Sequence, residues 1–492
     1  MSVDQQNPEY TTYLDEWRMV QDCCDGQRAI KKKRTKYLPA MEGVTEVESR
    51  YVNYLKRAVF VNFTGKTRDG LTGAIFRSKP EIELPNETSY LEDNADGAGE
   101  SLTSLAKDVT GEVISKGRHA LLVDYPEVQE GLSLEDVNRL SPKATINRYT
   151  AENFVNWRVE VVNGQKLLAL AVLCEEYDNN DDEFSYEIDK QYRVLRLRDG
   201  VYTQQLYRND EPITEEYIPK KANGEFFDFI PLFIIGSENN DPTVDVPPLA
   251  DVGHINIAHY RNSADLEENC FVHGQLTLGV SSSMSLSQFT EANPNGITVG
   301  SMAGHFLGDS GGFSVVQASE NQLADRLMVR KEEQMRKLGA RMMEVGAAKT
   351  ATQSLIEQAG ETSILTTIAD NVTEGIKACV EWCGMFMGAT QESTFVLNTK
   401  FFDEVADPQM LMAAMQLNEG GLIAKSDMQE LARIQGVIKD GRTNEDIDAE
   451  LEAEMSRIQA EVEPEEEVEE EVEEEIEEES VNSLTINEQD GI

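Results

Sequence analysis

The feature that most constrains the fold is a change in the period of the apolar residues between positions 118 and 235. The run QYRVLRLRDGVYTQQLY alternates apolar and polar residues on both sides of Asp199-Gly200, a strong signal for a two-residue β-hairpin. HALLVDY, KLLALAVLCEEY and FDFIPLFIIG are further strand-like runs. Before them, apolar residues recur at three-to-four spacing from Leu102 to Val113, ahead of Gly117, and predict a helix. We therefore predict an α+β domain with an antiparallel sheet over residues 1–246.

From residue 247 onward the apolar residues follow a helical period. Pro247-Pro248 stands where proline is tolerated, at a helix start, and predicts a helix over residues 247–273. A second long helix is predicted over residues 319–345, where Met328, Met335 and Met342 recur seven apart. This seam is typical of helices packed side by side with like helices, and an ordinary core helix has the same pattern. Residues 274–318 contain short β-like runs such as GITVG and predict a small inserted subdomain.

The C-terminal part begins with a break. Residues 346–363 hold 11 Gly, Ala, Ser or Thr in 18 positions, so close-approaching backbone should interrupt the helices there. Residues 364–410 start with an apolar stripe from Leu365 to Phe386, which predicts a long helix, and end near the strand-like run FVLNTKFF. Short helices are predicted within residues 411–460. Residues 461–479 include 14 Glu, so residues 461–492 are predicted to be an acidic tail, disordered or a solvated helix.

Charge and hydropathy limit the function classes. The chain has 44 Lys and Arg against 90 Asp and Glu, a net charge of −46, of which residues 441–492 contribute −20. An acidic surface repels DNA within a Debye length of about 8 Å, which disfavours a tight, groove-reading DNA binder. Residues 27–79 are the exception, with 13 basic and 4 acidic residues. A solvated face, an arm docked on an acidic neighbour, or nucleic-acid contact each explains them.

No membrane partner is expected from the sequence. The longest apolar run, LLALAVLC, is much shorter than a membrane-spanning helix, and the start MSVDQQNPEY is not a signal peptide. We therefore expect the chain to act in a cytoplasm or an intracellular assembly. Its six cysteines are too few for a disulfide framework and are expected to be reduced. His254, His259, Cys270 and His273 do not share one helix face, so we predict no metal site and no cofactor.

Two short motifs suggest chemistry that their surroundings do not support. GDSGG at residues 308–312 matches the nucleophile loop of trypsin-like serine proteases, with Ser310 as the nucleophile. That mechanism also needs a His base and an orienting Asp, but His119 lies in GRHALLV, without the family's context, and the other candidate histidines lie on a predicted helix. TGKT at residues 64–67 lacks the earlier glycine and the preceding strand of a phosphate-binding loop. We therefore expect no catalytic residue, and a serine hydrolase stays a remote alternative.

The chain resembles the portal proteins of tailed bacteriophages, and is most similar to a portal family catalogued as a domain of unknown function. Four segments carry the resemblance, which covers about residues 40–455: GRHALLVDYP, INRYTAENFVNWR, the stretch from IPLFIIGSENND to PPLADVGHINIAHYRNSADLEE, and AKTATQSLIEQAGETSILTTIADNV. FVLNTKFF and the glycine-then-helix segments after it match the portal pattern of an asparagine-containing strand followed by a helical crown.

This resemblance implies a portal-like α+β fold with a defined order of parts. Residues 1–246 would be the wing, 247–273 and 319–345 the two stem helices, 274–318 the clip and 346–363 the tunnel loop. Residues 364–410 would be a long apolar helix and a return to the wing, 411–460 a helical crown and 461–492 the acidic tail. Portal proteins form rings of twelve subunits at one capsid vertex. The implied location is the virion, with assembly in the host cytoplasm.

The resemblance also implies partners and a DNA-proximal segment. The partners would be further copies of this chain, double-stranded DNA in the channel, the terminase large subunit, a head-completion adaptor, and the major capsid and scaffolding proteins. Tunnel-loop residues expected to line the channel are Lys349, Thr350, Thr352, Gln353 and Glu357. A helix break pinned in the subunit interface, with Lys349 paired to a carboxylate, is the alternative for this segment. For the whole chain, the acidic composition leaves open a scaffold, chaperone or DNA-mimic protein.

Overall fold

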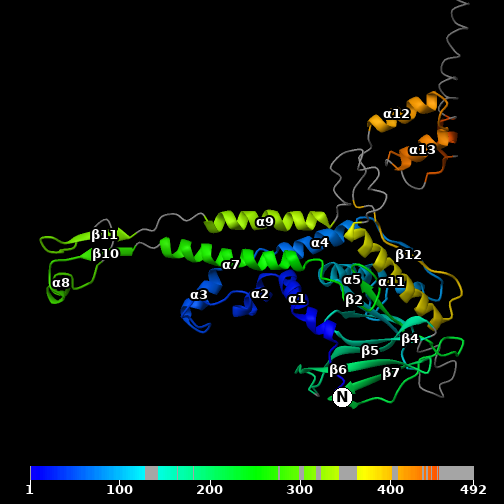
Figure 1. The fold of residues 1–492 in the computed structure, drawn as a ribbon, viewed down its shortest axis with the longest axis horizontal. Helices are drawn as coiled ribbons and strands as arrows, with labels where there is room; N and C mark the ends of the chain where they lie inside the picture. The colour runs from blue at the N-terminus through cyan, green and yellow to red at the C-terminus, as the bar shows by residue number, and fades with distance from the viewer. Residues whose placement is uncertain are drawn as a thin grey trace, which may run out of the picture. The chain divides into compact units, whose positions relative to one another are not determined.

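The structure is a computed structural model, and it describes residues 2–127, 142–162, 164–180, 182–274, 277–297, 304–316, 323–342, 363–399, 401, 408–434, 437–438, 442–444, 446–451 and 453. The chain forms two compact units, Met1–Phe401 and Phe402–Ile492. Helices and strands are both present in the first unit, in agreement with the α+β class predicted from the sequence (Figure 1). No helix in the described part of the chain is long and apolar enough to cross a membrane.

Helices dominate the first 116 residues of the chain. They are α1 (Pro8–Asp25), α2 (Gln27–Lys32), α3 (Ser49–Arg57), α4 (Phe63–Ile75) and α5 (Leu102–Lys116), with short 3₁₀ turns at Arg34–Lys36 and Ser89–Glu92. Side chains cap the N-termini of α1 and α5: Asn7 accepts from the amide of Glu9, and Ser101 accepts from the amide of Ser104. Gly117 ends α5 in the left-handed region with φ of 73°. A Cβ there would lie 3.1 Å from the Val246 carbonyl oxygen, so glycine suits this helix end.

Two antiparallel sheets follow, where the sequence predicted one. The first has the order β3-β2-β9 and consists of β2 (Arg118–Asp124), β3 (Thr145–Thr150) and β9 (Leu232–Gly236). The second is a meander of β4 (Phe154–Val162), β5 (Gln165–Asp178), β6 (Ile188–Arg198), β7 (Val201–Arg208) and β8 (Glu211–Pro212). The predicted hairpin is confirmed: Arg198 pairs with Val201, and Asp199 and Gly200 both have positive φ.

Three long helices follow the sheets: α7 (Ala250–His273), α9 (Leu323–Arg341) and α11 (Ile364–Met387). Between α7 and α9 lie β10 (Thr277–Ser281), α8 (Leu286–Ala292) and β11 (Gly312–Val316), with β10 and β11 paired antiparallel. The apolar stripe of α11 is buried, as its period predicted, and α11 packs against α5, β2 and β9. After it, β12 (Thr394–Val396) pairs with β1 (Glu81–Glu83), more than 300 residues earlier in the chain.

Besides the helical residues 446–451, the second unit contains the helices α12 (Pro408–Glu419) and α13 (Lys425–Ile434), which contact each other. Gly421, with φ of 70°, lies in the turn between them, and the Asn418 side-chain amide donates to the Ile423 carbonyl oxygen at 3.1 Å. This agrees with short helices separated by glycine. The acidic tail predicted over residues 461–492 lies outside the described residues.

Candidate functional site

Helices α7 and α9 form an antiparallel pair (Figure 1). Near the middle of α7, the Lys331 ammonium donates to the Ala258 carbonyl oxygen at 3.0 Å, and the His259 ring lies 3.4 Å from a Glu332 carboxylate oxygen. Further along, Asn269 of α7 and Leu323 of α9 line one cavity of about 370 Å³. Since residue numbers rise along α7 and fall along the facing stretch of α9, the helices run in opposite directions.

The buried side of α9 follows the predicted seam. Met335 and Met342 are buried, and Met328 is half-buried. Burial lowers the pKa of His259, while the nearby Glu332 carboxylate opposes that shift, so His259 packs in α7 as a neutral ring.

Polar contacts fix α7 to the N-terminal helices. Asn256 is fully buried. Its side-chain Oδ1 accepts from the Thr64 hydroxyl at 3.0 Å, and its side-chain Nδ2 donates to the Val61 backbone carbonyl oxygen at 2.9 Å. The Tyr54 hydroxyl donates to Asp265 at 2.7 Å, and Arg57 pairs with Glu268. Because buried polar groups need partners, these bonds set the position of α7 against α3 and α4. The basic segment 27–79 therefore serves partly as the support of α7.

The opposite side of α9 is exposed and basic. Residues Leu323–Arg341 include six Lys or Arg and three Asp or Glu, a net charge of +3 in a chain of −46. Leu323 and Val329 are 63% and 58% exposed. Exposed apolar side chains between exposed cations are typical of a surface that contacts another protein. The exposed cations of α9 are Arg326, Arg330, Arg336, Lys337 and Arg341.

The two ends of the helix pair differ in the residues that adjoin them. At one end is the β10–β11 pair with α8, whose N-terminus carries a capping box at Ser285 and Gln288. At the other end, the Leu365 amide donates to the Met342 carbonyl oxygen at 3.2 Å, so the two flanks of the 20-residue segment 343–362 meet. The residues predicted to line a channel lie outside the described residues; they are Lys349, Thr350, Thr352, Gln353 and Glu357.

The motifs that suggested catalysis or phosphate binding have the following surroundings. Ser310 is exposed in the turn before β11. His119 is buried in β2, where burial together with Lys116 and Arg148 lowers its pKa to about 3. In the TGKT segment, the Asn62 side chain already accepts from the Gly65 amide, as a helix cap does. Within the described ranges, no group of three or more His, Cys, Asp or Glu is placed to hold a metal ion.

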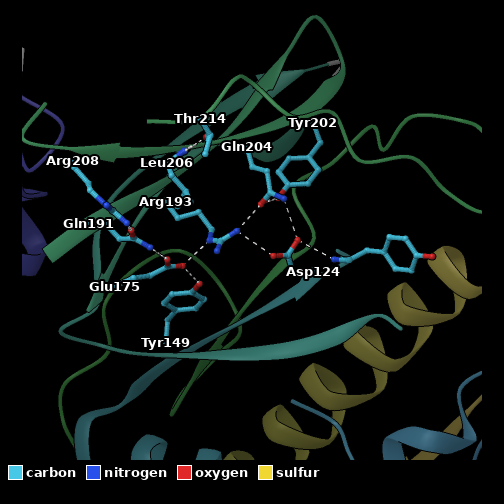
Figure 2. A network of polar contacts seen from close by, with 11 residues as sticks. Asp124, Tyr149, Glu175, Gln191, Arg193, Tyr202, Gln204, Leu206, Arg208 and Thr214 are labelled. Carbon is cyan, nitrogen blue, oxygen red and sulfur yellow. Dashed lines mark hydrogen bonds and ion pairs between the residues drawn. The ribbon is translucent and has the colours of Figure 1, made fainter. Parts of the chain in front are cut away.

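Arg193 is the centre of a polar network that the sequence did not predict (Figure 2). Its Nε donates to Glu175 at 2.6 Å, and its Nη1 donates to Asp124 at 3.1 Å. The Gln204 amide donates to the other Asp124 oxygen at 3.1 Å, and the Tyr149 hydroxyl donates to Glu175 at 2.6 Å. Because these residues come from β2, β3, β5, β6 and β7, the network ties the two sheets together.

The electrostatics of the network stabilise its charged form. Burial alone would raise the pKa of Glu175, but the Arg193 guanidinium and the hydrogen bonds from Arg193, Tyr149 and Gln191 hold it below its usual value. Burial raises the pKa of the Tyr149 hydroxyl well above its usual value, so that hydroxyl stays a donor. Glu175 and Asp124 are both paired with Arg193, which indicates that the network has a structural role and holds the two sheets together. The sequence signal was an acid directly after an apolar run: Asp124 follows HALLV, and Glu175 follows LAVLC.

Comparison with known proteins gives a family match and matches to solved structures. The family described as "Domain of unknown function (DUF4055)" matches residues 248–387, a range that runs from α7 through β10, β11 and α9 to the end of α11. No curated protein matches the chain. A chain of the structure described as "Neck of empty GTA particle computed with C6 symmetry" is 11% identical, with a TM-score of 0.39, over 80% of this chain and 94% of that chain.

Proposed function

We propose that this chain is a bacteriophage portal subunit, which assembles into a ring of about a dozen copies at one capsid vertex and conducts DNA during packaging and ejection. The observation that carries this proposal is the antiparallel α7–α9 pair, with a small β-insertion at one end and a segment with joined flanks at the other. Such a pair suits a ring, because each copy can present one helix face to the copy beside it.

The exposed side of α9 supports a contact between copies. Its apolar side chain Val329 is 58% exposed, while Leu323 and Leu327 are partly exposed where they line the cavity beside α7. Its cations fit an acidic surface, and another copy of this acidic chain offers one. The surfaces that meet are different, basic on one copy and acidic on the next, so the contact is heterologous. Such a contact, repeated from copy to copy, closes into a ring when a whole number of copies completes one full turn about the axis.

The acidic composition supports a role as a conduit. A lumen that carries part of the net charge of −46 per copy repels the phosphate backbone, so DNA can slide without being held. In this role the chain needs no catalytic residue and no cofactor; the terminase large subunit supplies the hydrolysis. Its other partners are the head-completion adaptor and the capsid and scaffolding proteins. Its location is the portal vertex of the virion, after assembly in the host cytoplasm.

Ring formation is the direct test. Native mass spectrometry and negative-stain imaging of the purified protein should give rings with a central channel. The double variant Arg330→Glu/Lys337→Glu, which reverses two exposed cations of α9, should dissociate the rings or lower their fraction at least about 10-fold. The matched control Lys166→Glu reverses an exposed cation on β5 and should leave rings intact. A stable monomer of the unmodified chain at micromolar concentration contradicts the proposal; rings in the double variant contradict only the role of α9.

The segment 346–363 is proposed to be the tunnel loop. Lys349 is its only basic residue, beside Glu357 and Glu361. One cation per copy can touch phosphates weakly, and such salt-sensitive contacts break easily as DNA advances. Lys349→Glu should leave rings intact in negative stain and lower the amount of DNA packaged in an in vitro packaging assay. Normal packaging by Lys349→Glu rings would remove this assignment and favour a pinned helix break.

A further inference from the structure

A second cavity lies away from the α7–α9 pair, between α4, α5 and the β2–β3 edge of the first sheet. Its volume is about 640 Å³. Helices α4 and α5 contribute residues four apart, such as Arg68 and Thr72 on α4 and Asp108 and Glu112 on α5, which lie on one side of each helix. His119 and Thr150 are direct partners in the β2–β3 ladder, so their side chains share the sheet face that lines the cavity.

The floor of this cavity holds polar atoms without partners. His119 is 2% exposed, and neither ring nitrogen has a hydrogen-bond partner. The Thr72 hydroxyl, also buried, has none either. A buried polar group without a partner costs about 1–3 kcal/mol, so a folded chain rarely keeps one that does not serve a ligand or solvent. These two side chains come from different elements and line the same space.

The charges that line the cavity balance, with Arg68, Lys107 and Arg148 against three acids, so the donors without partners, and not a net charge, favour an anion in the cavity. Its acids already have cationic partners: Asp69 pairs with Arg68 at 2.9 Å, and Asp108 with Arg148 at 2.7 Å. The third acid, Glu112, pairs with Lys116 at 2.8 Å. Lys107, which also lines the cavity, is exposed and has no carboxylate bound to it among the described residues. The lining thus combines an unpaired ammonium with a neutral imidazole and a hydroxyl, both of which can donate.

We propose that this cavity binds an oxyanion, held by the Lys107 ammonium, one ring N–H of His119 and the Thr72 hydroxyl. A phosphate or a carboxylate has several acceptor oxygens and can accept all three donors at once. Carboxylate and phosphate both have oxygens that accept these hydrogen bonds. The anion is therefore either a free anion in solution or the carboxylate of an acidic side chain on another copy. The cavity lining includes no residue of the proposed ring surface on α9.

The test is calorimetric titration of inorganic phosphate into the purified protein. Saturable binding of one phosphate per subunit is expected, and Lys107→Gln should weaken it about 10-fold, the effect of losing one charge-assisted hydrogen bond. The control Lys166→Gln removes an exposed lysine outside the cavity and should bind like the unmodified chain. His119→Phe should lose the rise in melting temperature that phosphate produces. Without phosphate it should melt no lower than the unmodified chain, because an unpaired polar group is replaced by an apolar ring.

Two arms distinguish the source of the anion. If phosphate binds both to rings and to subunits dissociated by Arg330→Glu/Lys337→Glu, the occupant is a free anion. If phosphate binds only to dissociated subunits, a carboxylate of a neighbouring copy occupies the cavity in the ring. Absence of saturable binding in dissociated subunits, or equal affinity of Lys107→Gln and the unmodified chain, overturns the proposal. Where the unmodified chain is itself monomeric, it takes the place of the dissociated subunits, and the same criteria apply.

Discussion

Replacing Arg193 by Met tests whether its network fastens the two sheets together. The substitution keeps an unbranched side chain of similar length but removes the donors to Glu175 and Asp124. Those carboxylates have side chains only 16% and 22% exposed, so both would lose the cation that compensates them. Removing one partner of a buried pair costs about 3–5 kcal/mol. The lower end applies here, because Tyr149 and Gln204 still donate to the two acids, so we expect a loss of about 3 kcal/mol.

The pH dependence separates this electrostatic loss from a packing defect. In the unmodified chain the pKa of Glu175 is lowered, so its contribution to stability is present above the unfolded pKa and is lost only as pH falls through the folded pKa. Without Arg193, burial is the largest remaining influence, so we expect the pKa of Glu175 to rise. The variant then gains stability by protonating Glu175 as pH falls. The difference between the two proteins should therefore shrink from about pH 7.5 to about pH 5.5.

Urea unfolding followed by tryptophan fluorescence measures the free energy of unfolding at each pH. Both pH values lie above the isoelectric point of about 4.4, so the chain has a net negative charge at each. Arg196→Met is the matched control, since Arg196 lies on the same strand and its guanidinium donates to the Tyr207 hydroxyl at 3.0 Å, with no carboxylate paired to it among the described residues. Its cost should stay below about 1 kcal/mol and should not depend on pH in this range. A loss of less than about 1 kcal/mol in Arg193→Met, or an equal loss at both pH values, refutes the reasoning.

Three further predictions concern other parts of the chain. In Gly375→Ala on α11, the new Cβ would lie 2.6 Å from the Ile235 side chain, so thermal unfolding should show a loss of stability of about 1–3 kcal/mol. The control Gly70→Ala adds a Cβ with nothing within 4 Å and should not destabilise the protein. Equal effects of the two substitutions contradict the packing argument. Ser310→Ala should leave ring formation unchanged in negative stain, and a peptidase activity that disappears in this variant would contradict a non-catalytic role. Truncation after Ala460 should also leave rings intact, and their loss would show that residues 461–492 are a packing element.

Local elements of the fold could be predicted, because their signals lie within one stretch of sequence. The Asp199-Gly200 hairpin needs only two alternating runs and a turn, and the stripe of α11 needs only its own period. Pairing between strands that are far apart in the sequence leaves no such local signal. β2 pairs with β9, about a hundred residues later, and β12 pairs with β1, so the division into two sheets was not predictable from alternation.

The candidate sites, too, could be predicted from the sequence only in part, because they combine residues from distant segments. The seam of α9 was visible as Met328, Met335 and Met342, but its basic outer side gains meaning only once the buried side is known. His119 was considered only as a catalytic base. That it is buried and without a hydrogen-bond partner depends on how α4, α5 and β2 meet around one cavity. The Arg193 network draws on five strands, and no spacing rule connects them.

The proposed portal role requires one acidic chain both to associate with itself and to let DNA pass. Two copies of net charge −46 repel each other at close range, because repulsion acts within a Debye length of about 8 Å. A contact between copies would therefore have to place local cations against the acidic surface, and in the proposed ring the +3 of α9 has this role, beside exposed apolar side chains. The apolar area supplies affinity, and the cations select which surface of the neighbour is met. Since α9 concentrates its cations on a contact surface, the remaining acidic surface stays free to repel the duplex. Association and repulsion thus depend on different residues.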